Sequence, residues 1–183
     1  TVTGVQTCAL PIFTSSFNEL ASALEKKNKA ATEESVKALR TVVTNHFKDK
    51  DPAIEKKTFA ELLRMYAADV KKSDLPSIFT TIEKEYHNDF TAFANDVYAT
   101  SVFATPEQAN KFLDKPALKT LKKDLAWITA ESMADARNKY MGSFNKTRTE
   151  IAAGNRLFIA GIRQMSPAKV FYPDANSTMR VSY

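Results

Sequence analysis

The sequence predicts an all-α fold that ends in one β-strand. Apolar residues recur every three or four positions along most of the chain, as they do on one face of a helix. Only 4 glycines and 7 prolines occur among the 183 residues, so long helices meet few residues that break them. Alternating side-chain character, which is typical of a strand, appears only at the very end, over residues 178–183. The composition, 44% hydrophobic and 26% charged, fits one globular domain or part of a larger one.

Residues 1–12 are expected to be foreign to the protein. Residues 2–12 resemble the in-frame translation of a widely used sequencing adapter, and no initiator methionine precedes them. Such segments are left out of a fold prediction. This removes Cys8, the only cysteine, so neither a disulfide nor a thiol nucleophile is predicted. A secretion signal ahead of residue 13 would have been lost with the true start of the chain.

Two helices are predicted at the start of the remaining chain. The first runs over about residues 16–28 and begins at a Ser-x-x-Glu capping box formed by Ser16 and Glu19. The second is expected to be capped by Thr32 and to keep one apolar stripe over residues 32–47.

A third helix is predicted from Pro52 to about residue 72. Asp51 precedes it, and proline at the first helical position gives up a donor that has no partner there. Its apolar stripe is the most regular in the chain and consists of Phe59, Leu62, Leu63, Tyr66 and Val70.

Shorter helices are predicted next. Ser73-Asp-Leu-Pro76 ends one helix and starts another, and two helices or one bent helix fit residues 79–97, with a polar break at 87–89. Thr105-Pro-Glu-Gln108 combines a cap, a first-turn proline and a reciprocal capping glutamine. A short helix is therefore expected to end near Leu113.

Pro116 opens the last helical region, in which a helical pattern continues to Met165. Gly142 is the expected break, and Ser166-Pro167 the stop, because proline disfavours the α conformation in the residue before it. Four apolar residues in its second half lie on one face: Ile151, Phe158, Ile162 and Met165. Glycine costs roughly 1 kcal/mol relative to alanine inside a helix, so close helix packing is the simplest explanation for two glycines here, Gly154 and Gly161.

The final segment, residues 169–183, differs from the rest. Pro173-Asp174 predicts a turn, in which the side chains of Asp174, Asn176 and Ser177 are expected to bond the nearby backbone instead of a substrate. The alternating residues 178–183 predict a strand. Because a strand needs a partner for its backbone groups, we expect the chain to stop at the edge of a sheet that it does not contain.

No residue of the chain is expected to be catalytic, cofactor-binding or metal-ligating. His46 and His87 fall on predicted helices with no strained serine turn nearby, so both are interpreted as surface or capping residues. Glu83 and His87, four residues apart, could share a metal ion, but two ligands do not make a zinc site, and an exposed pair is the preferred interpretation.

Two other groups of residues could form binding surfaces. Arg156 and Arg163 share a helix face, and solvated or interdomain ion pairs are expected of them in preference to substrate contacts. Phe112, Trp127 and Tyr140 could form an aromatic surface, but aromatic residues at helical spacing usually belong to a core.

The charge pattern argues against a nucleic-acid partner, although the formal net charge is +5. Lysines alternate with acidic residues, and no basic stripe with stacking aromatic residues is present. No apolar run approaches the roughly 20 residues of a transmembrane helix.

Three stretches resemble a known family. Lys169-Val-Phe-Tyr-Pro-Asp-Ala-Asn-Ser-Thr-Met-Arg-Val-Ser-Tyr183 resembles the segment by which peptidases of the S46 family leave an inserted helical domain and re-enter a chymotrypsin-like double β-barrel. Two weaker resemblances to that helical domain are found over residues 105–125 and in Asn155-Arg-Leu-Phe-Ile-Ala-Gly-Ile-Arg-Gln-Met165. Residues 13–100 match only in general helical character.

The resemblance implies a fragment of a bacterial serine dipeptidyl peptidase, periplasmic or surface-associated, that releases dipeptides from the free N-termini of oligopeptides. It implies three segments: an artefactual start at 1–12, a helical cap domain at 13–168, and a truncated return into the second barrel at 169–183. The family's Ser, His and Asp triad would lie outside the chain, its His and Asp before residue 13 and its Ser after Tyr183. The piece alone is therefore expected to be inactive.

Oligopeptides with a free N-terminus are the implied partners, a homodimer of the full protein is possible, and no cofactor is expected. A different class of function also remains open. The chain could be a stand-alone helical bundle that binds or scaffolds without catalysis, in which case the terminal strand is merely a tail.

Overall fold

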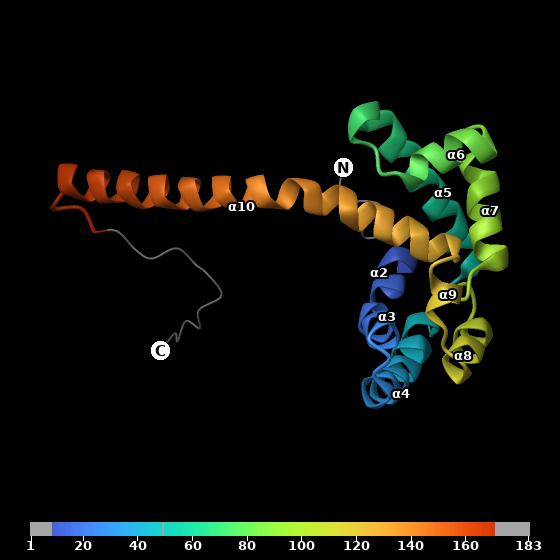
Figure 1. Ribbon diagram of the computed structural model, residues 1–183. Coiled ribbons are helices and arrows are strands. Elements are labelled where there is room, and N and C mark those ends of the chain that lie inside the picture. The colour runs from blue at the N-terminus through green and yellow to red at the C-terminus, as the bar shows by residue number, and fades with distance from the viewer. Residues whose placement is uncertain (1–8, 49, 171–183) are drawn as a thin grey trace. The chain divides into compact units, whose positions relative to one another are not determined.

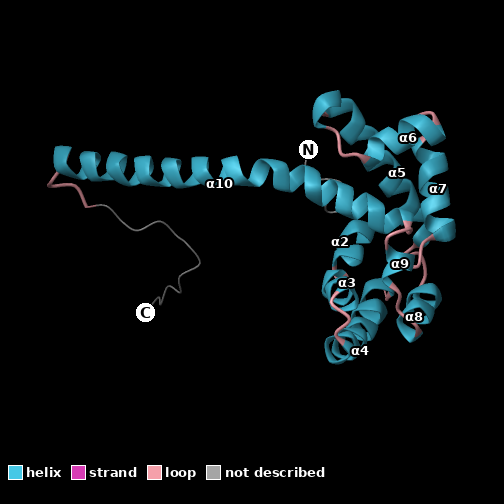
Figure 2. Cartoon of the chain, viewed as in Figure 1, coloured by secondary structure: helices cyan, strands magenta, loops and turns pink. Residues whose placement is uncertain are grey.

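The structure is a computed structural model that describes residues 9–48 and 50–170. All regular secondary structure in this part of the chain is helical (Figures 1 and 2), which confirms the all-α prediction there. The expected strand at 178–183 and the turn with Asp174, Asn176 and Ser177 lie outside the described residues. The chain divides into two compact units, residues 1–139 and 140–183.

The helices, in chain order, are α2 (Ala9–Ser15), α3 (Asn18–Glu25), α4 (Lys29–Phe47), α5 (Pro52–Asp69), the 3₁₀ turn η1 (Lys72–Asp74), α6 (Ile78–Tyr86), α7 (Phe90–Thr100), α8 (Pro106–Asp114), α9 (Leu118–Leu121) and α10 (Leu125–Met165).

The capping box predicted at Ser16 is wrong. Helix α2 leads directly into α3 through a tight turn, in which the amides of Ser16 and Phe17 donate to the carbonyls of Phe13 and Thr14. The residue before α3 is Phe17, whose side chain makes no capping hydrogen bond. Leu10 of α2 is buried, although it lies within the segment predicted to be foreign; that prediction stays untested by the fold.

Helix α4 begins four residues earlier than predicted. Its cap is Asn28, whose side-chain oxygen accepts from the amide of Ala31 at 3.2 Å. Thr32 lies inside the helix and donates its hydroxyl hydrogen to the carbonyl of Asn28 at 2.7 Å. Asparagine caps a helix at least as well as threonine, so the earlier of two possible caps is used.

The other local start signals are mostly confirmed. Asp51 caps α5 by accepting from the amides of Ala53 and Ile54, with Pro52 in the first turn. Thr105 caps α8 by accepting from the amide of Gln108. The reciprocal bond expected from Gln108 is not made, because its buried Oε1 has no hydrogen-bond partner.

The break predicted at 87–89 separates two helices, α6 and α7. His87 and Asn88 both adopt left-handed backbone conformations, with φ of 53° and 62°. The amide of Asn88 donates to the carbonyl of Ile82, and Asp89 then caps α7 through the amide of Ala92. Two successive left-handed residues reverse the chain, so α6 and α7 pack against each other.

One hydrophobic core runs through the first unit. Helix α5 packs against α7, α3 against α4, and α4 against α8 (Figure 1). Rings from distant parts of the chain meet at its centre: Phe17 lies edge-on to Phe103 at 4.9 Å, and Phe103 stacks on Trp127 at 6.4 Å between ring centroids. The side chains that are fully buried include Phe13, Phe17, Phe59, Phe93, Phe103, Leu63, Ile82 and Leu121.

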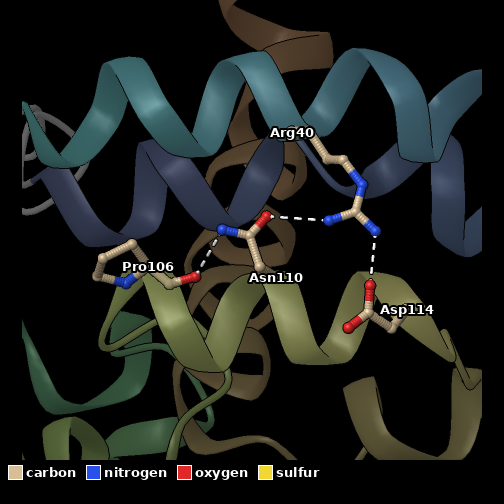
Figure 3. Close-up of polar contacts among 4 residues, drawn as sticks. All are labelled: Arg40, Pro106, Asn110 and Asp114. Carbon is tan, nitrogen blue, oxygen red and sulfur yellow. Dashed lines mark hydrogen bonds and ion pairs between the residues drawn. The ribbon is translucent and has the colours of Figure 1, made fainter.

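A polar clamp joins α4 to α8 at the surface (Figure 3). The guanidinium of Arg40 donates to Asn110 Oδ1 at 3.3 Å and to Asp114 Oδ1 at 2.7 Å. The side-chain amide nitrogen of Asn110, Nδ2, donates in turn to the backbone carbonyl of Pro106, one turn earlier in α8. The clamp lies on an exposed surface, where an ion pair contributes about 0–1 kcal/mol, so the buried core dominates the packing of these helices.

The break predicted at Gly142 is wrong, because α10 continues through this residue to Met165. The cost of one glycine in a helix, about 1 kcal/mol, is too small to interrupt a long run of good helix formers. Close packing at Gly154 and Gly161 is not observed either. A Cβ atom built on any of these three glycines meets no atom within 4 Å.

Candidate functional site: the groove beside Asp124

A buried carboxylate fixes the start of α10. Oδ1 of Asp124 accepts from the amides of Ala126 at 2.9 Å and Trp127 at 3.1 Å, and from the hydroxyl of Ser101 at 2.9 Å. Its Oδ2 accepts from the amide of Val102 at 2.8 Å. One side chain therefore satisfies the first amides of α10 and also holds the connection between α7 and α8.

The surroundings of Asp124 have two opposite effects on the pKa of its carboxyl group. Burial raises the pKa of the carboxyl group, while the four hydrogen bonds to the carboxylate lower it, and burial has the larger effect. Ser132, a buried residue of α10, plays a similar role for α6: its Oγ accepts from the amide of Ile78 at 2.9 Å and from the hydroxyl of Ser77 at 3.1 Å.

A groove of about 810 Å³ lies next to this anchored segment, within the first unit. Its walls come from α2, α3, α9 and the first turns of α10. Two of the lining residues, Lys122 just after α9 and Glu25 of α3, form a salt bridge of 3.3 Å. The residues with polar side chains that line the groove include Thr14, Ser15, Asn18, Ser22, Glu25, Lys122, Glu131, Asp135 and Arg137.

The groove carries groups that can bind a cation. Its wall on α10 carries two exposed carboxylates, Glu131 and Asp135, one helical turn apart. Carboxylates of this kind accept hydrogen bonds from ammonium groups. Trp127 and Met133, both almost fully buried, supply apolar surface below them.

A smaller hollow of about 350 Å³ lies between α5 and α7. Lys56, Lys57 and Arg64 give it a basic wall, but Arg64 already forms two hydrogen bonds with Glu61 on its own helix. This arrangement is typical of a solvated helix face.

His46 is not the surface residue that the sequence suggests. Its half-buried ring stacks on Phe13 with centroids 3.9 Å apart and meets the edge of Phe47. Lys50 Nζ lies 3.4 Å from its Nδ1. Burial, and then the charge of Lys50, lower the pKa of His46 to about 4. The imidazole is therefore neutral at pH 7 and packs as part of the aromatic core.

The structure does not bring Glu83 and His87 together as metal ligands. Glu83 forms a 2.8 Å salt bridge with Lys72, and exposed His87 ends α6 in a left-handed conformation, so its interpretation as a capping residue is confirmed. Among the described residues, no group of three or more His, Cys, Asp or Glu side chains is placed to hold a metal ion.

The aromatic prediction is correct for two residues of three. Phe112 and Trp127 are buried, with 6% and 3% of their surface exposed, whereas Tyr140 is 46% exposed. Arg156 and Arg163 are exposed on α10. None of the described helices combines the length and apolar character that crossing a bilayer requires.

Sequence reasoning missed Asp124, Ser132 and the groove. Asp124 follows Lys122-Lys123, and an aspartate just before an apolar helical stripe is a cap signal that could have been used. Its bonds to Ser101 and Val102, and those of Ser132 to Ile78, join residues 22 to 54 positions apart, and no local pattern encodes them.

Comparison with known proteins identifies the family. Residues 5–183 match the model of the family described as Peptidase S46. The chain is 28% identical to dipeptidyl-peptidase 7 of Phocaeicola vulgatus over 91% of its own length and 23% of the relative's. It is 33% identical to dipeptidyl-peptidase 7 of Capnocytophaga gingivalis, over 68% of its length and 17% of the relative's. It is also 26% identical to the Asp/Glu-specific dipeptidyl-peptidase of Porphyromonas gingivalis, over 100% of its own length and 25% of the relative's.

The family match includes residues 5–12, part of the segment predicted to be foreign. The chain spans about a quarter of the length of these relatives or less. Because the family model matches almost all of it, this chain belongs to the peptidase S46 family.

Proposed function

We propose that the chain is a helical part of a serine-type dipeptidyl peptidase that releases dipeptides from the free N-termini of oligopeptides. The observation that carries this proposal is the family match over residues 5–183, together with relatives whose names state dipeptidyl-peptidase activity. The triad belongs to parts of the parent protein outside these 183 residues, and the helical region caps the substrate cleft.

A helical cap has a physical role in such an enzyme. A rigid wall across one end of a cleft excludes chains that continue past it, and acceptors on that wall fix the terminal ammonium. The first unit provides the rigidity, since its core is continuous and Asp124 and Ser132 anchor α10 from inside. The second turn of α10 then presents Glu131 to the groove, and Asp135 follows one turn later.

The primary test uses the intact parent enzyme and peptides that differ only at the N-terminus. We expect release of dipeptides from a free peptide and none from its acetylated counterpart. Mass spectrometry of the products identifies the cleaved bond. Cleavage inside acetylated peptides would contradict the capped cleft, and absence of any peptidase activity in a folded parent would contradict the proposed function.

The groove is tested separately. An exposed ion pair contributes up to about 1 kcal/mol, so replacing both carboxylates, as Glu131→Gln with Asp135→Asn, is expected to raise KM about five-fold or less for free N-termini while kcat is kept. Glu107→Gln on α8, an exposed carboxylate that does not line the groove, is the matched control. Equal KM values for both variants would remove the groove from the substrate path.

Periplasmic or cell-surface placement of the parent is part of the same proposal, since external oligopeptides are the substrates it implies. Fractionation of cells that express the intact gene, with activity measured in each fraction, tests this placement. Activity confined to the cytoplasmic fraction would contradict it.

A further inference from the structure

The second unit carries a regular apolar stripe that no described residue covers. Four large side chains occur at intervals of seven residues along α10 and are strongly exposed: Phe144 (58%), Ile151 (57%), Phe158 (67%) and Met165 (84%). Monomeric proteins rarely leave a row of large apolar side chains in water.

Small residues alternate with the large ones. Thr147, Gly154 and Gly161 are also seven apart, and each lies three positions after one large residue and four before the next. Spacings of three and four in alternation place all seven on one stripe, the seam, which winds slowly along one side of the helix. Large and small residues in turn make knobs and holes, and glycine lets another backbone approach closely.

The seam itself carries no charged residue. Leu157, another exposed apolar residue, lies in a row that flanks it, together with Glu150, and Arg148 lies in the flanking row on the other side. Lys146, Arg156 and Arg163 lie in the rows farther away. An uncharged row of this length is typical of a helix face that packs against another element.

The open space at the glycines shows that the seam is not filled in this structure. A Cβ atom on Gly154 or Gly161 meets no atom within 4 Å. The close packing expected of these glycines therefore has to come from residues other than those that the structure describes.

We propose that residues 144–165 of α10 are one half of a helix–helix seam, and that the other half is a helix of the same parent polypeptide outside residues 1–183. The proposal rests on the larger parent assumed above: the chain spans only 23% and 25% of two relatives that it matches almost throughout. A helix tethered in the same polypeptide acts at an effective concentration of about millimolar, and a second copy of the chain competes poorly with it.

The test compares how fast a maleimide reacts with a cysteine placed at two neighbouring positions on opposite sides of the helix. Ile151→Cys places a thiol in the seam, and Thr149→Cys places one on the opposite side, two residues away, where the side chain is exposed too. In the 183-residue chain both are made in a Cys8→Ser background, since Cys8 is its only cysteine. In the intact parent we expect a maleimide to react with position 151 at least about ten-fold more slowly than with position 149. In the 183-residue chain the two rates should be equal.

Other outcomes overturn the proposal. Equal rates in the intact parent show that no helix covers the seam, and protection in the 183-residue chain that grows with concentration shows that a second copy does. If Ile151→Cys prevents folding, Met165→Cys at the end of the seam gives the same comparison against Arg163→Cys. Peptidase activity is measured on the same samples. If the parent is inactive but position 151 is protected, the proposed function is rejected and the proposed helix–helix seam is supported.

Discussion

Replacing the buried carboxylate at the start of α10 tests how much of the fold depends on one side chain. Asp124→Ala removes four hydrogen bonds and leaves the amides of Val102, Ala126 and Trp127 without their acceptor. Loss of a helix cap costs about 1 kcal/mol. Each buried group left unpaired costs about 1–3 kcal/mol. Part of this is offset, because burying the carboxylate is itself unfavourable, as its raised pKa indicates.

The expected net loss is about 3 kcal/mol in the free energy of unfolding. For a chain of this length it corresponds to a fall in Tm of about 6–12 °C. Urea titration measures it, with an unchanged m-value as the sign that the unfolded state is unaffected. Asp114→Ala is the control, since this aspartate is exposed and bonded only in the clamp with Arg40, and it should cost less than about 1 kcal/mol. Equal losses for the two variants would refute the role assigned to Asp124.

Three smaller effects follow from other contacts. Because the pKa of His46 is lowered to about 4 in the folded protein, the unfolded chain binds more protons below pH 6.5, so the contribution of His46 to stability is complete above pH 6.5 and falls as the pH drops. Since the ring is half exposed, the loss by pH 5 is about 1 kcal/mol. Thermal melts of His46→Phe should therefore show a weaker pH dependence between pH 6.5 and about 4. Ser132→Ala leaves the amide of Ile78 unpaired and should cost about 1–2 kcal/mol by calorimetry, whereas Ser77→Ala keeps that bond and should cost less. Gly154→Ala meets open space and should stabilise the 183-residue chain by up to about 1 kcal/mol; a loss of stability would mean that the glycine is already packed.

Helix starts with a complete local signal could be predicted from the sequence. Asp51-Pro52 and Thr105-Pro106 place a cap acceptor directly before a proline that has the helical φ, and both helices begin there. Where two signals compete, as with Asn28 and Thr32, or where tertiary packing sets the turn, as at Ser16, the local pattern chose the wrong residue.

Burial depends on what surrounds a helix, and the sequence pattern does not contain that. Trp127 and Tyr140 both have helical spacing and aromatic character, yet one is buried against Phe103 and the other is half exposed in the second unit. The hydrogen bonds of the candidate site also depend on tertiary structure. Asp124 could have been predicted as a cap, but its bonds to Ser101 and Val102 form only when the α7–α8 connection folds back onto it.

Trp127 is the single tryptophan of the chain, and its place in the first unit has a practical consequence. Its indole lies in the core, 3% exposed, so its emission reports the melting of that core alone. Far-UV circular dichroism sums the helices of both units, including the part of α10 from 140 to 165. If the two signals change at different temperatures, the distal half of α10 unravels as a separate cooperative unit, and its stability can be measured without any label.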